Sequence, residues 1–247
     1  MSARRPILAA LACCALALAG SAAAAAAPLV QGMVVGARGE ALVPARNLGA
    51  VATSVRVGRR SCAVAAGTPL AVLAAMRRAG GPAFTLRDYG RCGPAPVNSG
   101  QLFVNSIAGQ VNRGQDGWEY KVAGRSGTTG AADPSGPMGD GRRLRSGVQV
   151  LWFWCHSAGG GCQRALEVTV PARAARGGAV PVRVLGRDNE GRAVPVAGAV
   201  VRLGSDFAST AADGSATLLA PGIGGRVQVT AARAGLVPSF PQAVTVE

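Results

Sequence analysis

The sequence predicts an α+β domain with one main helix, followed by an all-β sandwich. Three observations support this. A capped apolar segment near residue 70 has helical spacing, short alternating runs on both sides of it are typical of strands, and no helical period occurs after Cys162. The 247 residues are 49% apolar and 4% aromatic, which excludes intrinsic disorder and predicts cores made mainly of Ala, Val and Leu.

The first 27 residues have the pattern of a secretory signal peptide. Arg4 and Arg5 precede an apolar run at residues 7–19, and small residues follow at 22–27. That run is shorter than the roughly 20 residues that span a bilayer, and no later run is longer, so we expect no transmembrane helix in the mature chain. A twin-arginine export signal and a lipidated Cys13 remain open as alternatives.

Four cysteines remain after the predicted leader is removed, and an even number in an exported chain predicts disulfide bonds. Three pairings are possible. We favour the pairing that joins nearest neighbours in the sequence, because its second bond then closes a glycine-rich turn. The predicted disulfides are Cys62 with Cys92 and Cys155 with Cys162.

Strand patterns surround the helix in the predicted first domain, residues 54–164. The preceding residues 28–53 have no sustained period, so we expect them to be poorly ordered apart from one strand at 30–35. Within the domain, apolar alternation predicts strands at residues 55–57, 62–64, 84–86, 101–107, 118–122 and 148–154. The last of these ends apolar on both faces, which predicts a central strand. The intervening residues 123–147 are glycine-rich, and a loop of that length is usually functional or mobile.

The helix is the best-defined element of that domain. Thr68 is a favourable N-cap, Pro69 suits the first helical turn, and glycines at 80 and 81 end the helix. Apolar side chains recur at helical spacing between these ends. We expect this face, which includes Leu70 and Leu73, to pack against a sheet.

The chain changes character after Cys162. Short β-type runs occur at residues 166–170, 179–184, 199–203, 216–219, 227–230 and 243–246. Turn signals such as those at residues 188–191 and 213–214 separate them. About 80 residues of regularly punctuated strands predict a small antiparallel β-sandwich at residues 165–247.

The first domain resembles the transcobalamin C-terminal-like family of extracellular domains. The most specific motif is Gly-Trp-Glu-Tyr-Lys-Val-Ala-Gly at residues 117–124, and the other matching segments are 67–70, 105–107 and 150–153. This resemblance covers roughly residues 54–155. It implies a β-grasp-like fold and membership of a group associated with soluble ligands. Cobalamin itself is not carried over, because those carriers hold it against a helical domain that this sequence lacks. Ala123 also departs from the usual Asn.

The C-terminal region resembles bacterial Ig-like and carboxypeptidase-regulatory-like domains. The resemblance rests on residues 194–199 and on the Asp213–Gly214 turn before a strand pattern. Such domains act as spacers or adhesive units. Together with the leader, this resemblance predicts a bacterial protein that is secreted, extracellular or associated with the cell envelope.

The composition excludes most common catalytic chemistries. His156 is the only histidine and Lys121 the only lysine, so a three-histidine zinc site is impossible. Nothing resembles a serine nucleophile elbow, a P-loop or a dinucleotide fingerprint. We do not favour a carboxylate pair of Asp116 and Glu119, a metal site at residues 155–162 or a calcium site at residues 188–190, because turns and a disulfide account for these residues. We therefore expect no enzyme activity, no cofactor and no metal.

The formal net charge of +14, about +12 without the leader, comes almost entirely from arginine. Phosphate contacts from Arg59–Arg60, Arg77–Arg78 and residues 142–145 would suit nucleic acid. The arginines are spread over both domains, however, and no nucleic-acid motif is present. We expect no nucleic-acid partner and a basic surface attracted to anionic envelope polymers.

Four aromatic residues have two possible roles. They fill the core beside the helix, or they line a groove and stack on a ligand. These tentative ligand-binding residues are Trp118, Tyr120, Trp152 and Trp154, of which Trp154 is the one most expected to be exposed. The sequence thus predicts a non-enzymatic ligand-binding or adhesion protein for a small soluble ligand or an envelope polymer. A structural spacer without a ligand site is the alternative, and the oligomeric state stays open.

Overall fold

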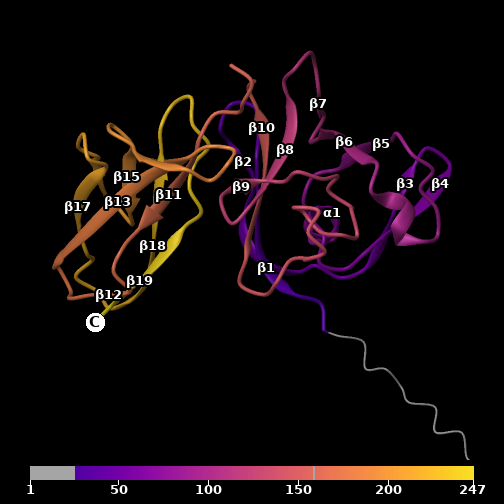
Figure 1. Ribbon diagram of the computed structural model, residues 1–247. Coiled ribbons are helices and arrows are strands. Elements are labelled where there is room, and N and C mark those ends of the chain that lie inside the picture. Colours follow the sequence, from indigo (N-terminus) through magenta and orange to yellow (C-terminus); the bar gives the residue numbers. More distant parts are fainter. Residues whose placement is uncertain (1–25, 158) are drawn as a thin grey trace, which may run out of the picture.

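The computed structural model describes residues 26–157 and 159–247 of the chain. It is 47% strand and 6% helical. The prediction of an α+β, β-grasp-like first domain followed by a sandwich was therefore wrong, and the fold is better described as all-β. The predicted helix does form, but it is a single ten-residue element beside several sheets (Figure 1). Much of the unexpected strand content comes from residues that lack a clear period.

The main sheet has five strands and crosses the middle of the molecule (Figure 1). Its order is β2 (Ala41–Gly49), β1 (Leu29–Val35), β10 (Gln149–Cys155), β8 (Gly117–Val122) and β9 (Arg125–Ser126). The predicted strand at 148–154 is β10, and it is central as expected. The expectation of a poorly ordered segment at residues 28–53 was wrong, because this segment supplies β1 and β2. β1 pairs with β10 in parallel, and parallel strands are typically buried on both faces and so lack alternation.

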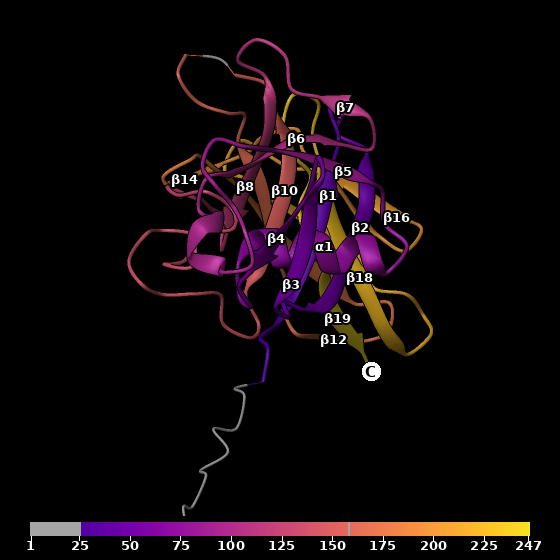
Figure 2. The same ribbon diagram turned by 90° about the vertical axis from the view of Figure 1, so that its right-hand side faces the viewer.

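The helix α1 (Pro69–Arg78) packs on one face of this sheet (Figure 2). The hydroxyl of Thr68 accepts a hydrogen bond from the backbone N–H of Ala71, and Pro69 occupies the first turn, as predicted. Two smaller sheets flank the helix. They are the pair β3 (Thr53–Val57) and β4 (Arg60–Val64), and the trio β5 (Phe84–Asp88), β6 (Leu102–Ile107) and β7 (Gln110–Val111), with a short 3₁₀ turn at Pro96–Ser99 between β5 and β6.

Residues 165–247, called here the C-terminal part, form two sheets around a shared apolar core. One holds β11 (Ala165–Thr169), β13 (Ala179–Arg187), β14 (Ala193–Pro195) and β17 (Ser215–Leu219). The other holds β12 (Arg173–Ala174), β19 (Gln242–Val246), β18 (Gly225–Ala232), β15 (Val200–Leu203) and β16 (Asp206–Ser209). Each of the six runs predicted from the sequence overlaps one of these strands.

A third apolar cluster joins the C-terminal part to the rest of the chain, residues 26–164, called here the N-terminal part. This interface cluster consists of Met33, Val35, Leu151, Phe153, Cys155, Ala165, Val237 and Phe240. The main sheet is therefore covered on both faces, by α1 on one side and by the C-terminal part on the other (Figures 1 and 2). Burial of both faces explains why β10 is apolar on both sides.

Both predicted disulfides are present. Cys62 and Cys92 join β4 to the loop after β5, with Cα atoms 5.2 Å apart, and Cys155 and Cys162 close the turn after β10, with Cα atoms 5.1 Å apart. Over the described residues, no helix has both the length and the apolar character needed to cross a membrane. The predicted signal peptide, residues 1–27, falls almost wholly outside those residues.

Candidate functional site

The structure brings the four predicted aromatic residues together, but inside the N-terminal core. Trp118 contacts Trp154 edge to face at 5.7 Å between ring centroids, and Tyr120 contacts Trp152 at 5.5 Å. All four are at most 5% exposed, including Trp154, the residue most expected to be exposed. They lie on the side of the main sheet that faces α1. None presents a ring to solvent, so the core role applies and the stacking role does not.

The long loop at residues 123–147 closes this core. The backbone N–H of Leu70 donates to the carbonyl of Ala131 at 2.8 Å, which ties the loop to the first turn of α1. The Tyr120 hydroxyl donates to the carbonyl of Thr129 at 2.8 Å, and burial raises the pKa of Tyr120 to about 12. Ala131, Ala132 and Leu144 of the loop are buried. The loop expected to carry function is thus packed against the core.

The alternative metal and carboxylate sites have other roles. Cys155 and Cys162 are bonded to each other and do not act as metal ligands. The Asp116 carboxylate accepts the backbone N–H of Ser157 at 2.9 Å, a hydrogen bond that keeps the pKa of Asp116 below its usual range. No cluster of three or more potential metal-ligating side chains occurs in residues 26–157 and 159–247.

The only lysine of the chain makes one of the polar contacts between the two parts. Lys121 is 1% exposed, and its Nζ donates to the backbone carbonyl of Asp188 at 2.7 Å. Its Nζ also lies 5.9 Å from the centre of the Phe153 ring. Burial lowers the pKa of Lys121 to about 8, although Asp188 and neighbouring carboxylates oppose this shift. The turn considered as a calcium site therefore accepts a buried cation from the other part.

The strongest candidate site is a cleft of about 780 Å³ between the two parts. Clefts between packed units are common ligand sites in proteins. The cleft combines glycine-rich turns with cationic side chains from segments far apart in the sequence. We call it the arginine cleft, after its charged lining residues Arg38, Arg202 and Arg233, which His156 accompanies.

Arg38 is held at the cleft by the tight turn between β1 and β2. The N–H of Gly36 donates to the carbonyl of Glu40 at 2.8 Å, and Gly39 has a φ of +78°, which glycine adopts without strain. The Glu40 carboxylate accepts the N–H of Arg38 and the side-chain amide of Gln110, both at 2.8 Å. The carboxylate is thus used to brace the turn, while the Arg38 side chain is exposed.

The other two arginines come from the C-terminal part. Arg202 alternates with the buried residues Val201 and Leu203 on β15, so its side chain points out of the core. Its guanidinium lies 5.6 Å from the centre of the Phe207 ring on the adjacent β16, and this contact orients the charge. Arg233 follows β18 in a turn. The N–H of Leu236 donates to the carbonyl of Arg233 at 3.1 Å and closes this turn.

His156 connects the two walls of the N-terminal part at the cleft. Its Nε2 lies 2.7 Å from the carbonyl of Ala37, and its Nδ1 lies 3.5 Å from the Asp116 carboxylate. Its backbone N–H donates to the side-chain carbonyl of Gln163 at 2.8 Å. With both ring nitrogens facing acceptors, the imidazole is positioned to hold the turn that carries Arg38.

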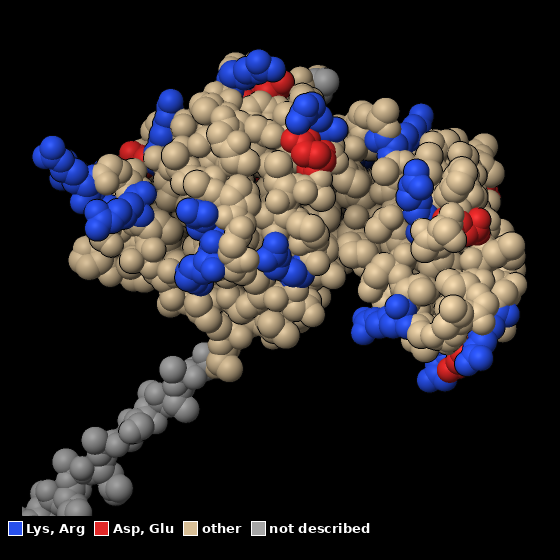
Figure 3. All heavy atoms as spheres, turned by 180° about the vertical axis from the view of Figure 1, so that it is seen from behind, with Lys and Arg blue, Asp and Glu red and all other residues tan. Residues whose placement is uncertain are grey.

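The charge of the cleft is unbalanced. No Asp or Glu is among its described lining residues, and across residues 26–157 and 159–247 no carboxylate forms an ion pair with Arg38, Arg202 or Arg233. Other arginines are scattered over both parts of the molecule (Figure 3). Several arginines that line one concave surface without a carboxylate partner favour an anionic ligand.

Sequence reasoning did not identify the arginine cleft. Arg38, Arg202 and Arg233 are isolated residues among many arginines. The pairing of β15 with β18 brings Arg202 near Arg233, and the packing of the two parts adds Arg38. The nearest sequence signal was His156 beside Cys155, which marks one wall. Comparisons with protein-family models, with curated proteins and with solved structures found no match.

Proposed function

We propose that this protein is a secreted or cell-envelope-associated binding protein that holds an anionic ligand in the arginine cleft. The single observation that carries the proposal is that three arginines line a cleft of about 780 Å³ and that, among the described residues, none of them has an ion-pair partner and no carboxylate lines the cleft. Each guanidinium offers several N–H donors in a plane that matches a phosphate or carboxylate group. The ligand class we infer is an anionic envelope polymer.

Export is supported by two independent features. The two disulfides are bonds that oxidising compartments favour, and the leader pattern at residues 1–27 provides a route out of the cytosol. A basic surface of this size would also attract anionic polymers before they reach the cleft. A binding role rather than catalysis fits the cleft, whose described lining residues pair no nucleophile with a base.

The test is calorimetric titration of the mature protein with two defined probes, a short poly(glycerol phosphate) and an oligogalacturonate. Arg202→Gln and Arg233→Gln each remove one charge-assisted contact and are expected to weaken binding of the preferred probe at least tenfold. Arg226→Gln is the matched control, since Arg226 is an exposed arginine on β18 that does not line the cleft. It should leave the affinity unchanged.

Two results would overturn the proposal. One is equal binding by the wild type and both cleft variants, which would place any binding elsewhere. The other is a duplex DNA oligonucleotide that binds more tightly than either polymer at physiological salt, since that would indicate a nucleic-acid partner.

A structural spacer is the second candidate. The interface cluster favours it, because eight mostly buried apolar residues fix the two parts against each other and make the pair a rigid unit. The spacer predicts that neither probe binds and that the two parts unfold together.

A further inference from the structure

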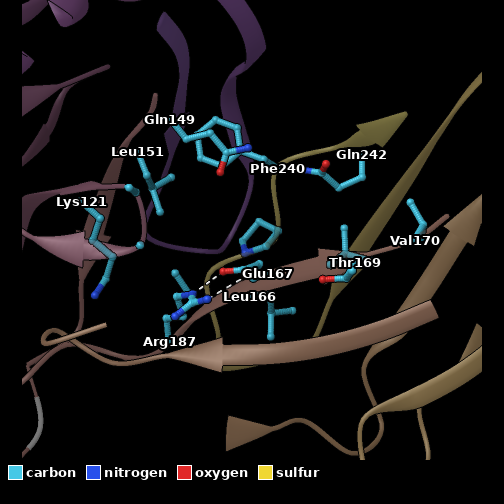
Figure 4. A pocket seen from close by; sticks show the side chains of 15 residues that line it. Lys121, Gln149, Leu151, Leu166, Glu167, Thr169, Val170, Arg187, Phe240 and Gln242 are labelled. Atoms are coloured by element: carbon cyan, nitrogen blue, oxygen red, sulfur yellow. Dashed lines mark hydrogen bonds and ion pairs between the residues drawn. The ribbon is translucent and has the colours of Figure 1, made fainter. Parts of the chain in front are cut away.

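A second cavity, of about 390 Å³, lies between the two parts along the edge of β11. We call it the edge cavity. Figure 4 shows Gln149, Leu151 and Phe240 on one side of it, and the Glu167–Arg187 ion pair with Thr169 on the other. The volume is within the range of small-ligand pockets, about 300–1,000 Å³. No residue of the arginine cleft that carries charge lines this cavity.

The register of β11 shows which of its backbone groups point into the cavity. Residues 165, 167 and 169 pair with Arg187, Leu185 and Arg183 of β13. The N–H of Val184 donates to the carbonyl of Gly214, which lies on the side of β13 away from β11. The backbone groups of the odd-numbered residues of β13 therefore point toward β11, where they bond to residues 165, 167 and 169. Since backbone groups alternate along a strand, the N–H and C=O groups of residues 166, 168 and 170 point to the other edge.

That other edge is filled at only one end. The N–H of Leu166 donates to the carbonyl of Val237 at 2.8 Å, and the N–H of Val237 donates to the carbonyl of Arg164 at 3.0 Å. These two bonds form a short parallel pairing. The chain then leaves the edge at Pro238. Among the described residues, no backbone partner faces Val168 or Val170, although both residues line the cavity.

Backbone groups turned away from solvent without a partner are costly, and proteins rarely leave them so. Val168 is 3% exposed, and the C-terminal and N-terminal parts together shield this edge. We propose that the edge cavity binds an extended peptide segment, which adds to β11 as a strand beside Val168 and Val170. Its backbone would continue the strand position that Val237 begins.

The walls of the cavity define the preferred peptide. Leu151 and Phe240 offer apolar contact, while Gln149 and Gln242 offer amide groups. Arg187 is paired with Glu167, and the Nζ of Lys121, the other charged lining residue, donates to the carbonyl of Asp188. An uncharged segment with alternating apolar and polar side chains suits this lining. Because paired strands have the same rise per residue, about 3.3 Å, a segment of about three or four residues covers the edge from Val168 to Val170. This ligand class differs from the anion of the arginine cleft, and the inference does not depend on it.

The direct test follows the Val168 amide in the mature wild-type protein. The probe is the capped tetrapeptide acetyl-Val-Gln-Val-Thr-amide, and the control is the same peptide with its backbone nitrogens methylated. We expect the probe at millimolar concentration to shift the amide resonances of Val168 and Val170 and to slow their hydrogen exchange. The Leu166 amide, already bonded to Val237, should change little. The methylated peptide should bind much more weakly, because its backbone nitrogens can no longer donate to the carbonyls of Val168 and Val170 and its N-methyl groups obstruct strand pairing.

A pair of variants separates the backbone contact from the side chain. Val170→Pro removes the edge N–H and is expected to weaken probe binding about fivefold, the typical effect of one hydrogen bond. Val170→Ala shortens the side chain but keeps the N–H, and should bind as the wild type does. The proposal is overturned if the probe leaves the Val168 amide unchanged in the wild type. It is also overturned if the methylated peptide binds equally well, since that would indicate apolar contact without strand addition.

Discussion

The two faces of strands β8 and β10 differ in composition although both are largely buried. One face carries Trp118, Tyr120, Trp152 and Trp154 into the core beneath α1. The other face carries Leu151 and Phe153 into the interface cluster, with Lys121 at its margin. The first face is closed by aromatic packing, whereas the second combines apolar packing with one buried cation. The difference shows that large rings fill the interior of one part, while the joint between parts also uses polar contacts.

This comparison explains where candidate sites occur. The loop at residues 123–147 and the helix cover the aromatic face, and in the described structure only Trp118 of its four aromatic residues borders a cavity, of about 360 Å³. The opposite face borders both the arginine cleft and the edge cavity, which lie where the two parts meet imperfectly around the interface cluster. Function is therefore proposed at the junction and not in the aromatic core.

The largest effect on the free energy of unfolding is expected from a substitution on the aromatic face. Trp152→Ala removes a side chain that is 1% exposed, together with the hydrogen bond from its Nε1 to the carbonyl of Pro69 at 3.2 Å. We expect the free energy of unfolding to fall by about 3–5 kcal/mol, as measured by urea denaturation followed by circular dichroism. A loss below about 1 kcal/mol would show that this face is not an essential core.

A slightly smaller effect is expected on the opposite face. Phe153→Ala opens a gap in the interface cluster, where Phe153 is fully buried, and should cost about 3 kcal/mol because the two parts can shift to close the gap. We expect calorimetry to show one transition for the wild type and two for Phe153→Ala. The control is Phe207→Ala, at a residue 63% exposed on β16, which should change the stability by less than about 0.5 kcal/mol. Persistence of one transition in Phe153→Ala would mean that the parts are coupled by other contacts.

The buried lysine makes the second face sensitive to pH. The folded state holds the pKa of Lys121 at about 8, below the 10.5 of an unburied lysine. Between these pH values the lysine holds its proton more often in the unfolded chain than in the folded one, so the free energy of unfolding rises with pH. Below pH 8 the full cost of burying the charge is present. We expect a gain of about 2 kcal/mol between pH 7 and 10. Above pH 10 the raised pKa of Tyr120 reverses the trend, because the unfolded tyrosine ionises first.

Urea denaturation across this pH range measures the effect, with Lys121→Met as the comparison. The variant replaces the ammonium with an apolar group of similar length and should abolish the rise between pH 8 and 10. A rise that persists in Lys121→Met would assign the pH dependence to another group.

The smallest effect on stability is expected at two separate turns of the N-terminal part. Ala108 and Ala123 both precede a glycine and have φ values of +53° and +48°, which alanine adopts at a cost. Asn tolerates this conformation, so Ala108→Asn and Ala123→Asn should each stabilise the protein by about 0.5–1 kcal/mol in thermal denaturation. Ala123 lines the edge cavity and Ala108 does not. If only Ala108→Asn stabilises, the junction between the parts restricts the side chain at 123.

The sequence was sufficient for elements with local signals. The helix followed from Thr68 and Pro69, and the disulfides followed from the spacing of four cysteines. The strands of the C-terminal part were predicted because each is short, alternates in burial and is bounded by turn residues. β13, for example, alternates exposed and buried residues over most of its length.

The sequence was insufficient where tertiary contacts decide. β1 reads as an apolar run without alternation because the main sheet is covered on both faces. β2 contains Pro44, which argues against a central strand, but β2 is an edge strand where proline is tolerated. These two strands turned the expected α+β domain into an all-β one. The candidate sites could not be predicted either, since Arg38 and Arg233 meet only when the two parts pack together.

All three tryptophans lie in one core, so the fluorescent residues are confined to one part of the molecule. Every tryptophan and tyrosine precedes residue 165, so the C-terminal part contains only phenylalanine as an aromatic residue. Intrinsic fluorescence therefore reports on the N-terminal part alone, and unfolding confined to residues 165–247 would be nearly silent at tryptophan wavelengths. A tryptophan introduced in place of the exposed Phe207 would give the second part its own signal.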